Sequence, residues 1–215
     1  MQDEGTEQIV VLAKAPVPGR VKTRLHVAYT PEAAATLADA ALRDTLAAVK
    51  ACRAPRRLVA LDGEPGSWAN GDFEVVPQAD GSFAERLDAA WAHVTGPCVQ
   101  IGMDTPQVTA ELLDDGLDAL ARPGVDAVLG LALDGGWWAL GLREPAPGIF
   151  DGVAMSADDT GDQQLAALRR RGLRVHLLAT LRDLDRPDDV AAIADAHPHL
   201  RVSIRVRELA SDAGR

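Results

Sequence analysis

The sequence of 215 residues is poor in cysteine, in basic residues and in long apolar runs. Its two cysteines, Cys52 and Cys98, have no CxxC or Cys/His spacing, which indicates free thiols in a reducing cytoplasm. Lys and Arg number 22 against 32 Asp and Glu, and the net charge of −10 argues against binding to nucleic acid or to an anionic membrane. No apolar run approaches the roughly 20 residues that span a bilayer. The acidic residues 1–8 do not resemble a signal peptide, so we expect a cytoplasmic protein.

Internal repeats, low-complexity tracts and linkers are also absent, and the length suits one α/β domain. Short apolar runs alternate with helical patterns, which predicts a mostly parallel sheet flanked by helices. Strands are expected at residues 9–13, 58–62, 73–76, 98–102, 125–134, 137–142 and 173–178. Helices are expected to begin near residues 31, 82, 109, 159 and 187, the second ending near Val94 and the last before Pro198. Residues 201–206, RVSIRV, are predicted to form an edge strand or a tail.

A basic loop follows the first predicted strand. No acidic residue occurs between Glu7 and Glu32, and the loop carries Lys14, Arg20, Lys22 and Arg24. It leaves the carboxyl end of a strand, where open α/β sheets bind ligands, and several cations on one loop suit a diphosphate or triphosphate. A solvated basic face is the alternative. A Walker A loop and a Rossmann glycine fingerprint are both missing from this segment.

Aspartates follow other predicted strands. Asp104 comes directly after residues 98–102, and carboxylates in that position can hold Mg²⁺ or Mn²⁺ against phosphate oxygens. The alternative for Asp104 is an Asx turn that caps the next helix. Asp134 precedes two glycines and two tryptophans, which suits a sugar or base site or, equally, an ordinary turn with core tryptophans. Asp183 and Asp185 can face one side of an extended segment and complete the metal site or hold substrate.

Five segments taken together resemble one family. They are Lys14–Leu25, Gln78 with Gly81 and Arg86, Gly102–Pro106, Asp134–Gly141 and Asp183–Asp189. In this order they are similar to the motifs of the DUF2064 family in the GT-A superfamily of nucleotide-diphospho-sugar transferases. The stretch Lys22–Leu25 also looks like the loop of phospholactate guanylyltransferases.

The resemblance implies a GT-A fold, with a Rossmann-like mostly parallel sheet, over a single domain of residues 1–215. A nucleotide-binding half would cover about residues 8–104 and an acceptor half about residues 105–200. Asp104 would stand in the place of the metal aspartate. Thr105, Met155, Arg186 and the two tryptophans after the double glycine depart from the motifs on the acceptor side, so the identity of the acceptor is what they put in doubt.

Three hypotheses for the function remain, two of them enzymatic reactions and one without catalysis. A glycosyltransferase would use a nucleotide-diphospho-sugar donor and a small-molecule acceptor, whereas a nucleotidyltransferase would join a nucleoside triphosphate to a small phosphorylated acceptor and release pyrophosphate. A non-catalytic nucleotide-binding module is the third. Oligomerisation is left open, with Trp68 or residues 201–206 as a candidate interface.

Roles are assigned by residue. The predicted catalytic residues are Asp104, Asp134 and Lys22. The predicted nucleotide-binding residues are Lys14, Pro18, Gly19, Arg20, Lys22, Thr23, Arg24 and Gln78. The predicted substrate-binding residues are Gly135, Gly136, Trp137 and Asp183, and the predicted metal ligands are Asp104 and Asp185.

Overall fold

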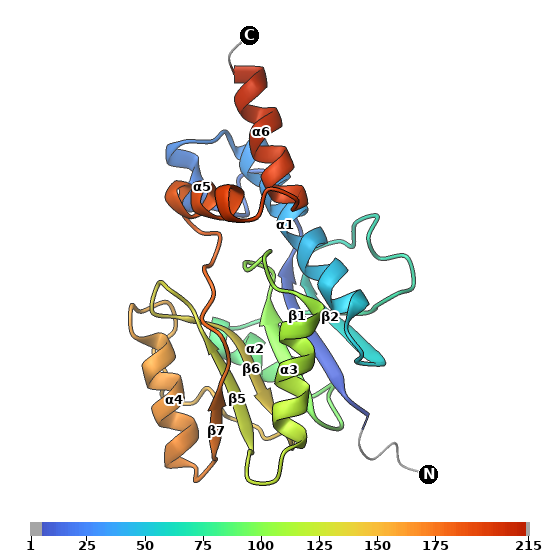
Figure 1. Cartoon of the computed structure of the whole chain (residues 1–215), viewed down its shortest axis with the longest axis vertical. Helices are drawn as coiled ribbons and strands as arrows, with labels where there is room; N and C mark the ends of the chain where they lie inside the picture. Colours follow the sequence, from blue (N-terminus) through green and yellow to red (C-terminus); the bar gives the residue numbers. More distant parts are fainter. Residues whose placement is uncertain (1–5, 214–215) are drawn as a thin grey trace.

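The computed structural model describes residues 6–213, which form a single seven-stranded sheet with helices on both faces (Figure 1). The strands are β1 Gln8–Lys14, β2 Arg56–Asp62, β3 Glu74–Pro77, β4 Cys98–Gly102, β5 Ala127–Leu131, β6 Trp137–Leu142 and β7 Val175–Leu177. Their order across the sheet is β3-β2-β1-β4-β6-β5-β7. Only β6 runs antiparallel to its neighbours β4 and β5. The predicted mostly parallel α/β fold is therefore confirmed.

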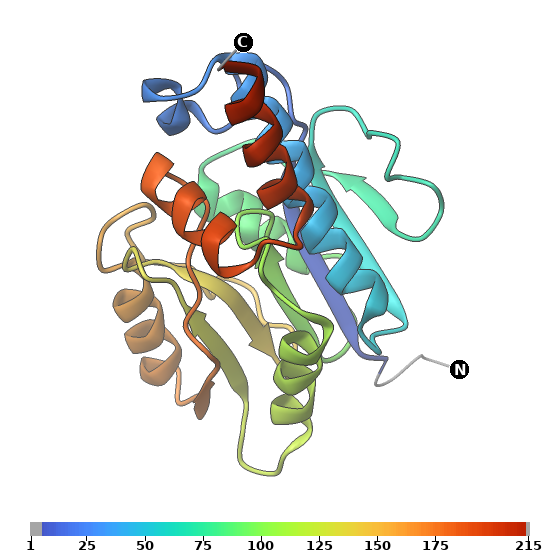
Figure 2. The ribbon, with the colours of Figure 1, turned by 45° about the horizontal axis from the view of Figure 1, so that its top comes forward.

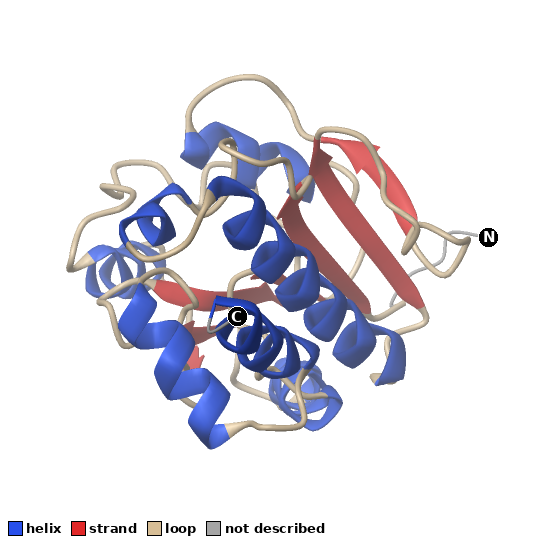
Figure 3. Cartoon of the chain, turned by 90° about the horizontal axis from the view of Figure 1, so that it is seen from above, coloured by secondary structure: helices blue, strands red, loops and turns tan. Residues whose placement is uncertain are grey.

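Residues 6–213 also form six α-helices, and a short 3₁₀ helix, Thr23–Val27, lies in the basic loop. The helices are α1 Pro31–Ala51, α2 Phe83–Trp91, α3 Ala110–Ala121, α4 Thr160–Arg170, α5 Pro187–Ala196 and α6 Arg201–Ala213. One face of the sheet packs against α1 and α3, and the other packs against α2 and α4. Figure 3, seen from above, shows α1 running alongside the strands with α6 next to it, and a helix on the other side of the sheet.

Strand β1 lies between these two cores because both of its faces are apolar. Ile9 and Val11 belong to the core under α1, whereas Val10 and Leu12 belong to the core under α2. A strand that is buried on both faces reads as a continuous apolar run, as the sequence predicted here.

Helix starts follow the predicted capping chemistry. The hydroxyl of Thr30 accepts a hydrogen bond from the backbone N–H of Ala33 at 3.2 Å, and Pro31 occupies the first helical position. Ser82 and Glu85 form a reciprocal capping box at the start of α2. The capping box fixes the first turn of α2, which faces the pocket described below.

The prediction for residues 201–206 is wrong, because they begin α6 and form neither an edge strand nor a tail. Val202, Val206 and Leu209 line one side of this helix and pack into a core with α1 and α5. Buried Asp44 of α1 accepts the backbone N–H groups of Arg201 and Val202, which caps the helix. Figure 2 shows α6 lying along α1.

Other boundaries differ less. Helix α2 ends at Trp91 and not near Val94, and β7 keeps only three of the six residues expected for it. Trp68 is 7% exposed and belongs to the core, so it is not available as an interface residue. In the described part of the chain, no helix combines the length and apolar character needed to cross a membrane.

Candidate active site

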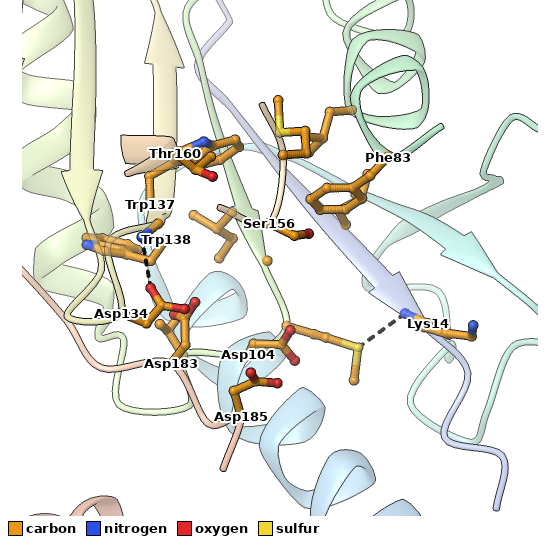
Figure 4. A pocket seen from close by; sticks show the side chains of 18 of the residues that line it. Lys14, Phe83, Asp104, Asp134, Trp137, Trp138, Ser156, Thr160, Asp183 and Asp185 are labelled. Carbon is orange, nitrogen blue, oxygen red and sulfur yellow. Dashed lines mark hydrogen bonds between the residues drawn. The ribbon is translucent and has the colours of Figure 1, made fainter. Parts of the chain in front are cut away.

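A pocket of about 690 Å³ opens at the carboxyl ends of the parallel strands. Its lining comes from the ends of β1 and β4, the first turn of α2, the β5–β6 turn, residues 155–160 and the segment after β7. These segments are far apart in the chain and meet because parallel strands end at one edge of the sheet. In Figure 4 the aspartates gather on one side of this pocket, and Lys14 and Phe83 lie on the other.

Four aspartates line the acidic side of the pocket: Asp104, Asp134, Asp183 and Asp185. The carbonyl of Asp104 accepts the backbone N–H of Leu184 at 2.7 Å, which joins the end of β4 to the segment after β7. The structure therefore brings these four acids together at one edge of the sheet.

Asp183 is the most perturbed of these acids. Burial, and then the negative charges of Asp104 and Asp134, raise the pKa of Asp183 from 3.8 to about 7, while Lys22 opposes the change. Burial is thus the main reason why the ionised form of Asp183 is unfavourable, and the neighbouring carboxylates add to it.

The basic loop contacts these acids directly. Lys22 adopts a left-handed conformation with φ of 50°, and its side chain is only 4% exposed. Its ammonium lies 2.7 Å from a carboxylate oxygen of Asp104 and also donates to the carbonyl of Leu184. Arg24 donates to Asp185, and this carboxylate raises the pKa of the Arg24 guanidinium above its ordinary value. Two of the four loop cations are thus paired with the predicted metal ligands.

The predicted site residues divide between the pocket and its surroundings. Those that line the pocket are Lys14, Arg24, Gln78, Asp104, Asp134, Gly136, Trp137, Asp183 and Asp185. Those outside its lining are Pro18, Gly19, Arg20, Lys22, Thr23 and Gly135. Arg20 and Thr23 are exposed at the surface, whereas Lys22 reaches the site only through Asp104.

The β5–β6 turn is shaped by the protein's own packing. Gly135 has φ of +89°, and a Cβ there would overlap the carbonyl of Asp158. The carbonyl of Gly135 accepts the backbone N–H of Gly161 at 2.8 Å. Gly135 therefore allows the β5–β6 turn to pack closely against residues 158–161. The turn and this segment form one wall of the pocket.

That wall is acidic and aromatic. Asp134 and Asp158 are exposed on it, and Trp137 lines it while stacking on Phe150 with 5.8 Å between ring centroids. Trp138 is buried and donates its indole N–H to the carbonyl of Ala179, so it belongs mainly to the core. Between residues 133 and 160 the lining contains no basic side chain.

Arg86 and Phe83 are pocket residues to which the sequence analysis gave no role. The guanidinium of Arg86 lies over the Phe83 ring, 5.6 Å from its centroid, and Phe83 is 43% exposed. The spacing of Gln78 and Arg86 in the matched motif was a signal for the arginine. Nothing in the sequence distinguishes Phe83 from a core phenylalanine.

The oxygen-only donor set suits Mg²⁺ or Mn²⁺. Within residues 6–213, no three His, Cys, Asp or Glu side chains converge closely enough to coordinate an ion as they stand. The residues nevertheless fit a divalent cation, because four carboxylates line one side of the pocket, and the charges of Asp104 and Asp134 add to the effect of burial on the pKa of Asp183.

Solved structures share the fold. A proposed nucleotide-diphospho-sugar transferase from Desulfovibrio desulfuricans G20 is 24% identical, with 96% of each chain covered and a TM-score of 0.86. CMP:2-keto-3-deoxy-manno-octonic acid synthetase complexed with CTP is 12% identical, with 88% of this chain and 97% of that chain covered and a TM-score of 0.55. Rv0371C from Mycobacterium tuberculosis H37Rv in complex with manganese is 22% identical, with 87% and 97% covered and a TM-score of 0.51.

These likenesses establish the nucleotide-diphospho-sugar transferase fold that the motifs led us to expect. A search of curated proteins found no match to the chain. A family described as "Uncharacterized protein conserved in bacteria (DUF2064)" matches residues 15–157, which is more than half of the sequence. The chain therefore belongs to the DUF2064 family.

Proposed function

We propose that this protein is a metal-dependent glycosyltransferase that uses a nucleotide-diphospho-sugar donor and an acceptor hydroxyl. The observation that carries the proposal is the wall formed by residues 133–160, which presents Asp134, Asp158 and Trp137 without any basic side chain. An acidic wall repels a phosphorylated acceptor, whereas a neutral hydroxyl benefits from a carboxylate that orients it and accepts its proton. A sugar ring can also pack against an indole face.

In this proposal the donor lies across the carboxyl ends of β1 and β4. Arg24 faces its phosphates from the basic loop, and Lys14 also contacts the donor. About residues 8–104 would form the donor half and about residues 105–200 the acceptor half. Asp104 and Asp185, assisted by Asp183, would hold Mg²⁺ or Mn²⁺, which would neutralise charge on the departing nucleoside diphosphate. Asp134 is the residue we assign to the acceptor hydroxyl, because it is exposed on the acidic wall beside the other carboxylates.

A nucleotidyltransferase is the second candidate, and the basic loop favours it. Four loop cations would suit a triphosphate better than a diphosphate. Only Lys14 and Arg24 of the four line the pocket, however, and Arg24 already neutralises Asp185. The loop is therefore less cationic towards the pocket than its sequence suggests, which weakens this second reading.

The products separate the two reactions. The protein with Mn²⁺ is offered nucleotide-diphospho-sugars with a mixture of polyols and, separately, nucleoside triphosphates with phosphorylated acceptors. We expect release of nucleoside diphosphate from the first set and no pyrophosphate from the second. Pyrophosphate formation that depends on a phosphorylated acceptor would refute the glycosyltransferase proposal.

Two variants test the assigned roles. Asp134→Asn should lower transfer to the acceptor by roughly 100-fold or more while leaving donor binding unchanged. Asp104→Asn should abolish the effect of Mn²⁺ on donor affinity. Asp115→Asn is the matched control, because Asp115 is exposed on α3 and does not line the pocket. Equal donor affinity of Asp104→Asn and the wild type, with and without Mn²⁺, would remove the metal from the proposal.

A further inference from the structure

A second charged cluster lies at the end of the pocket away from the four aspartates. Asp62, the last residue of β2, has a carboxylate oxygen 3.4 Å from the ammonium of Lys14 and 3.9 Å from a guanidinium nitrogen of Arg86. Lys14 and Asp62 are register partners in the parallel β1–β2 pair, so both side chains leave the sheet on the same face. That face is the one covered by α2, which carries Arg86.

The arrangement of this cluster is fixed by Gln78. The amide nitrogen of Gln78 donates to the carbonyls of Ala13 and Ala60 at 2.7 and 3.0 Å, so its orientation is set by two strand ends. Its amide oxygen then faces a guanidinium nitrogen of Arg86 at 3.4 Å. The nitrogen Nε of Arg86 is buried and finds no hydrogen-bond partner within residues 6–213, so the protein alone does not saturate the guanidinium.

The side chains of the cluster present a hydrogen-bond acceptor flanked by two donors. Lys14 and Arg86 can only donate, and ionised Asp62 between them can only accept. All three are partly exposed, at 40%, 30% and 30% of the side chain in the order Lys14, Arg86, Asp62. Lys14 and Arg86 line the pocket, and Asp62 borders it through its contacts with both. A ligand that satisfies this edge must offer acceptor, donor and acceptor in that order.

Among the nucleobases, only uracil and thymine have such an edge. Their two carbonyl oxygens flank one N–H, whereas guanine offers one acceptor and two donors, cytosine one donor and two acceptors, and adenine a donor and an acceptor. We propose that Lys14, Asp62 and Arg86 read the imide edge of the donor's base, so that the donor is a uridine or thymidine diphospho-sugar. This inference rests on the proposed use of a nucleotide donor.

Two further features place a base here. Phe83 is exposed at this end of the pocket beside Arg86 and offers an aromatic face for stacking. The sheet order puts β1 between β2 and β4, so Asp62 and Asp104 stand two strand spacings apart, about 10 Å. A nucleoside diphosphate can reach across that separation, with its base at β2 and its phosphates near β4. Figure 4 shows Phe83 and Lys14 on the side opposite the four aspartates.

Base selectivity of the wild-type protein is the primary test. Binding of UDP, dTDP, CDP, GDP and ADP is measured by calorimetry in the presence of Mn²⁺. We expect UDP and dTDP to bind at least tenfold more tightly than the other three. Equal binding of all five, or preference for a purine or for CDP, would overturn the base assignment while leaving a nucleotide donor in place. Binding of none would overturn the use of a nucleotide donor and this inference with it.

A variant then tests the acceptor group in the middle of the edge. Asp62→Asn turns that group into a donor as well, which suits the ring nitrogen of cytosine. UDP affinity should fall tenfold or more, and CDP affinity should stay unchanged or rise. Asp72→Asn is the matched control, since Asp72 pairs with Lys50 at the surface away from the pocket. An equal loss of affinity for all five nucleotides in Asp62→Asn would contradict a role in reading the base.

Discussion

Replacing Asp183 by asparagine should stabilise the metal-free protein, and more so at high pH. The wild-type carboxyl is half-buried beside Asp104 and Asp134, and these surroundings raise its pKa from 3.8 to about 7. Its ionised form is therefore unfavourable in the folded chain. Asp183→Asn keeps the size of the side chain and removes the charge that burial and like charges oppose.

The size of the effect follows from the two pKa values. Between pH 3.8 and about 7 the unfolded carboxyl is ionised while the folded one is protonated, so folding takes up a proton and stability falls as pH rises. A difference of roughly three pH units, at about 1.36 kcal/mol each, amounts to about 4 kcal/mol above pH 7. At pH 5 only the interval from pH 3.8 to pH 5 contributes, so the destabilisation by Asp183 is about 1.6 kcal/mol. Below pH 3.8 this destabilisation vanishes.

Urea unfolding of both proteins in EDTA, at pH 5 and at pH 8, measures this difference. The gain in the free energy of unfolding from Asp183→Asn should be larger at pH 8 than at pH 5 by about 2.5 kcal/mol. Added Mn²⁺ should reduce the gain, because the cation would stabilise the ionised wild-type carboxylate. The reasoning is refuted if Asp183→Asn destabilises the protein at pH 8, or if its gain is the same at both pH values. Asp185→Asn serves for comparison, since it removes the partner of Arg24 and should show no such gain.

Three further predictions concern the packing of the fold around the pocket. Asp44→Ala should lower the free energy of unfolding by about 1–2 kcal/mol because it removes the cap of α6, and an unchanged urea midpoint would contradict that role. Gly135→Ala should lower the free energy of unfolding by more than about 1 kcal/mol, since the new methyl would overlap the carbonyl of Asp158 at a positive φ. A melting temperature equal to that of the wild type would show that the turn is not held in this way. Burial raises the pKa of the Cys52 and Cys98 thiols, so both should react with a disulfide reagent only after unfolding, and fast labelling of the native protein would be inconsistent with their buried positions.

Local signals were enough to predict most of the fold. Every residue of β1 from Ile9 to Ala13 is apolar and buried, and the capping pair Ser82 and Glu85 marks the start of α2 within four residues. The prediction failed for residues 201–206, where Val202 and Val206 also fit an alternating strand pattern. Their helical face becomes visible only with Leu209, and its partners on α1 lie more than 150 residues earlier in the chain.

The positions of aspartates in the sequence also predicted part of the site. Asp104 was noted because it follows a predicted strand and Asp183 because it lies on an extended segment before the last helix, and the pocket contains both. Asp62 ends β2 in the same way, yet its position alone carried no signal of a role. The role proposed for Asp62 depends on its contacts with Lys14 and Arg86. Both are far from Asp62 in sequence and contact it only because of the β1–β2 register and the packing of α2.

The basic loop shows why composition predicts charge better than function. Its local excess of cations suggested a site open to phosphates, but in the fold Lys22 lies against Asp104 and Arg24 against Asp185. Each pair joins residues more than 80 positions apart, so neither can be seen in the loop itself. The cations and the acids at this end of the pocket therefore act as one partly neutralised group. A cation that took the carboxylates would free the same lysine and arginine for an anion, and this couples the affinities of the site for metal and for phosphate.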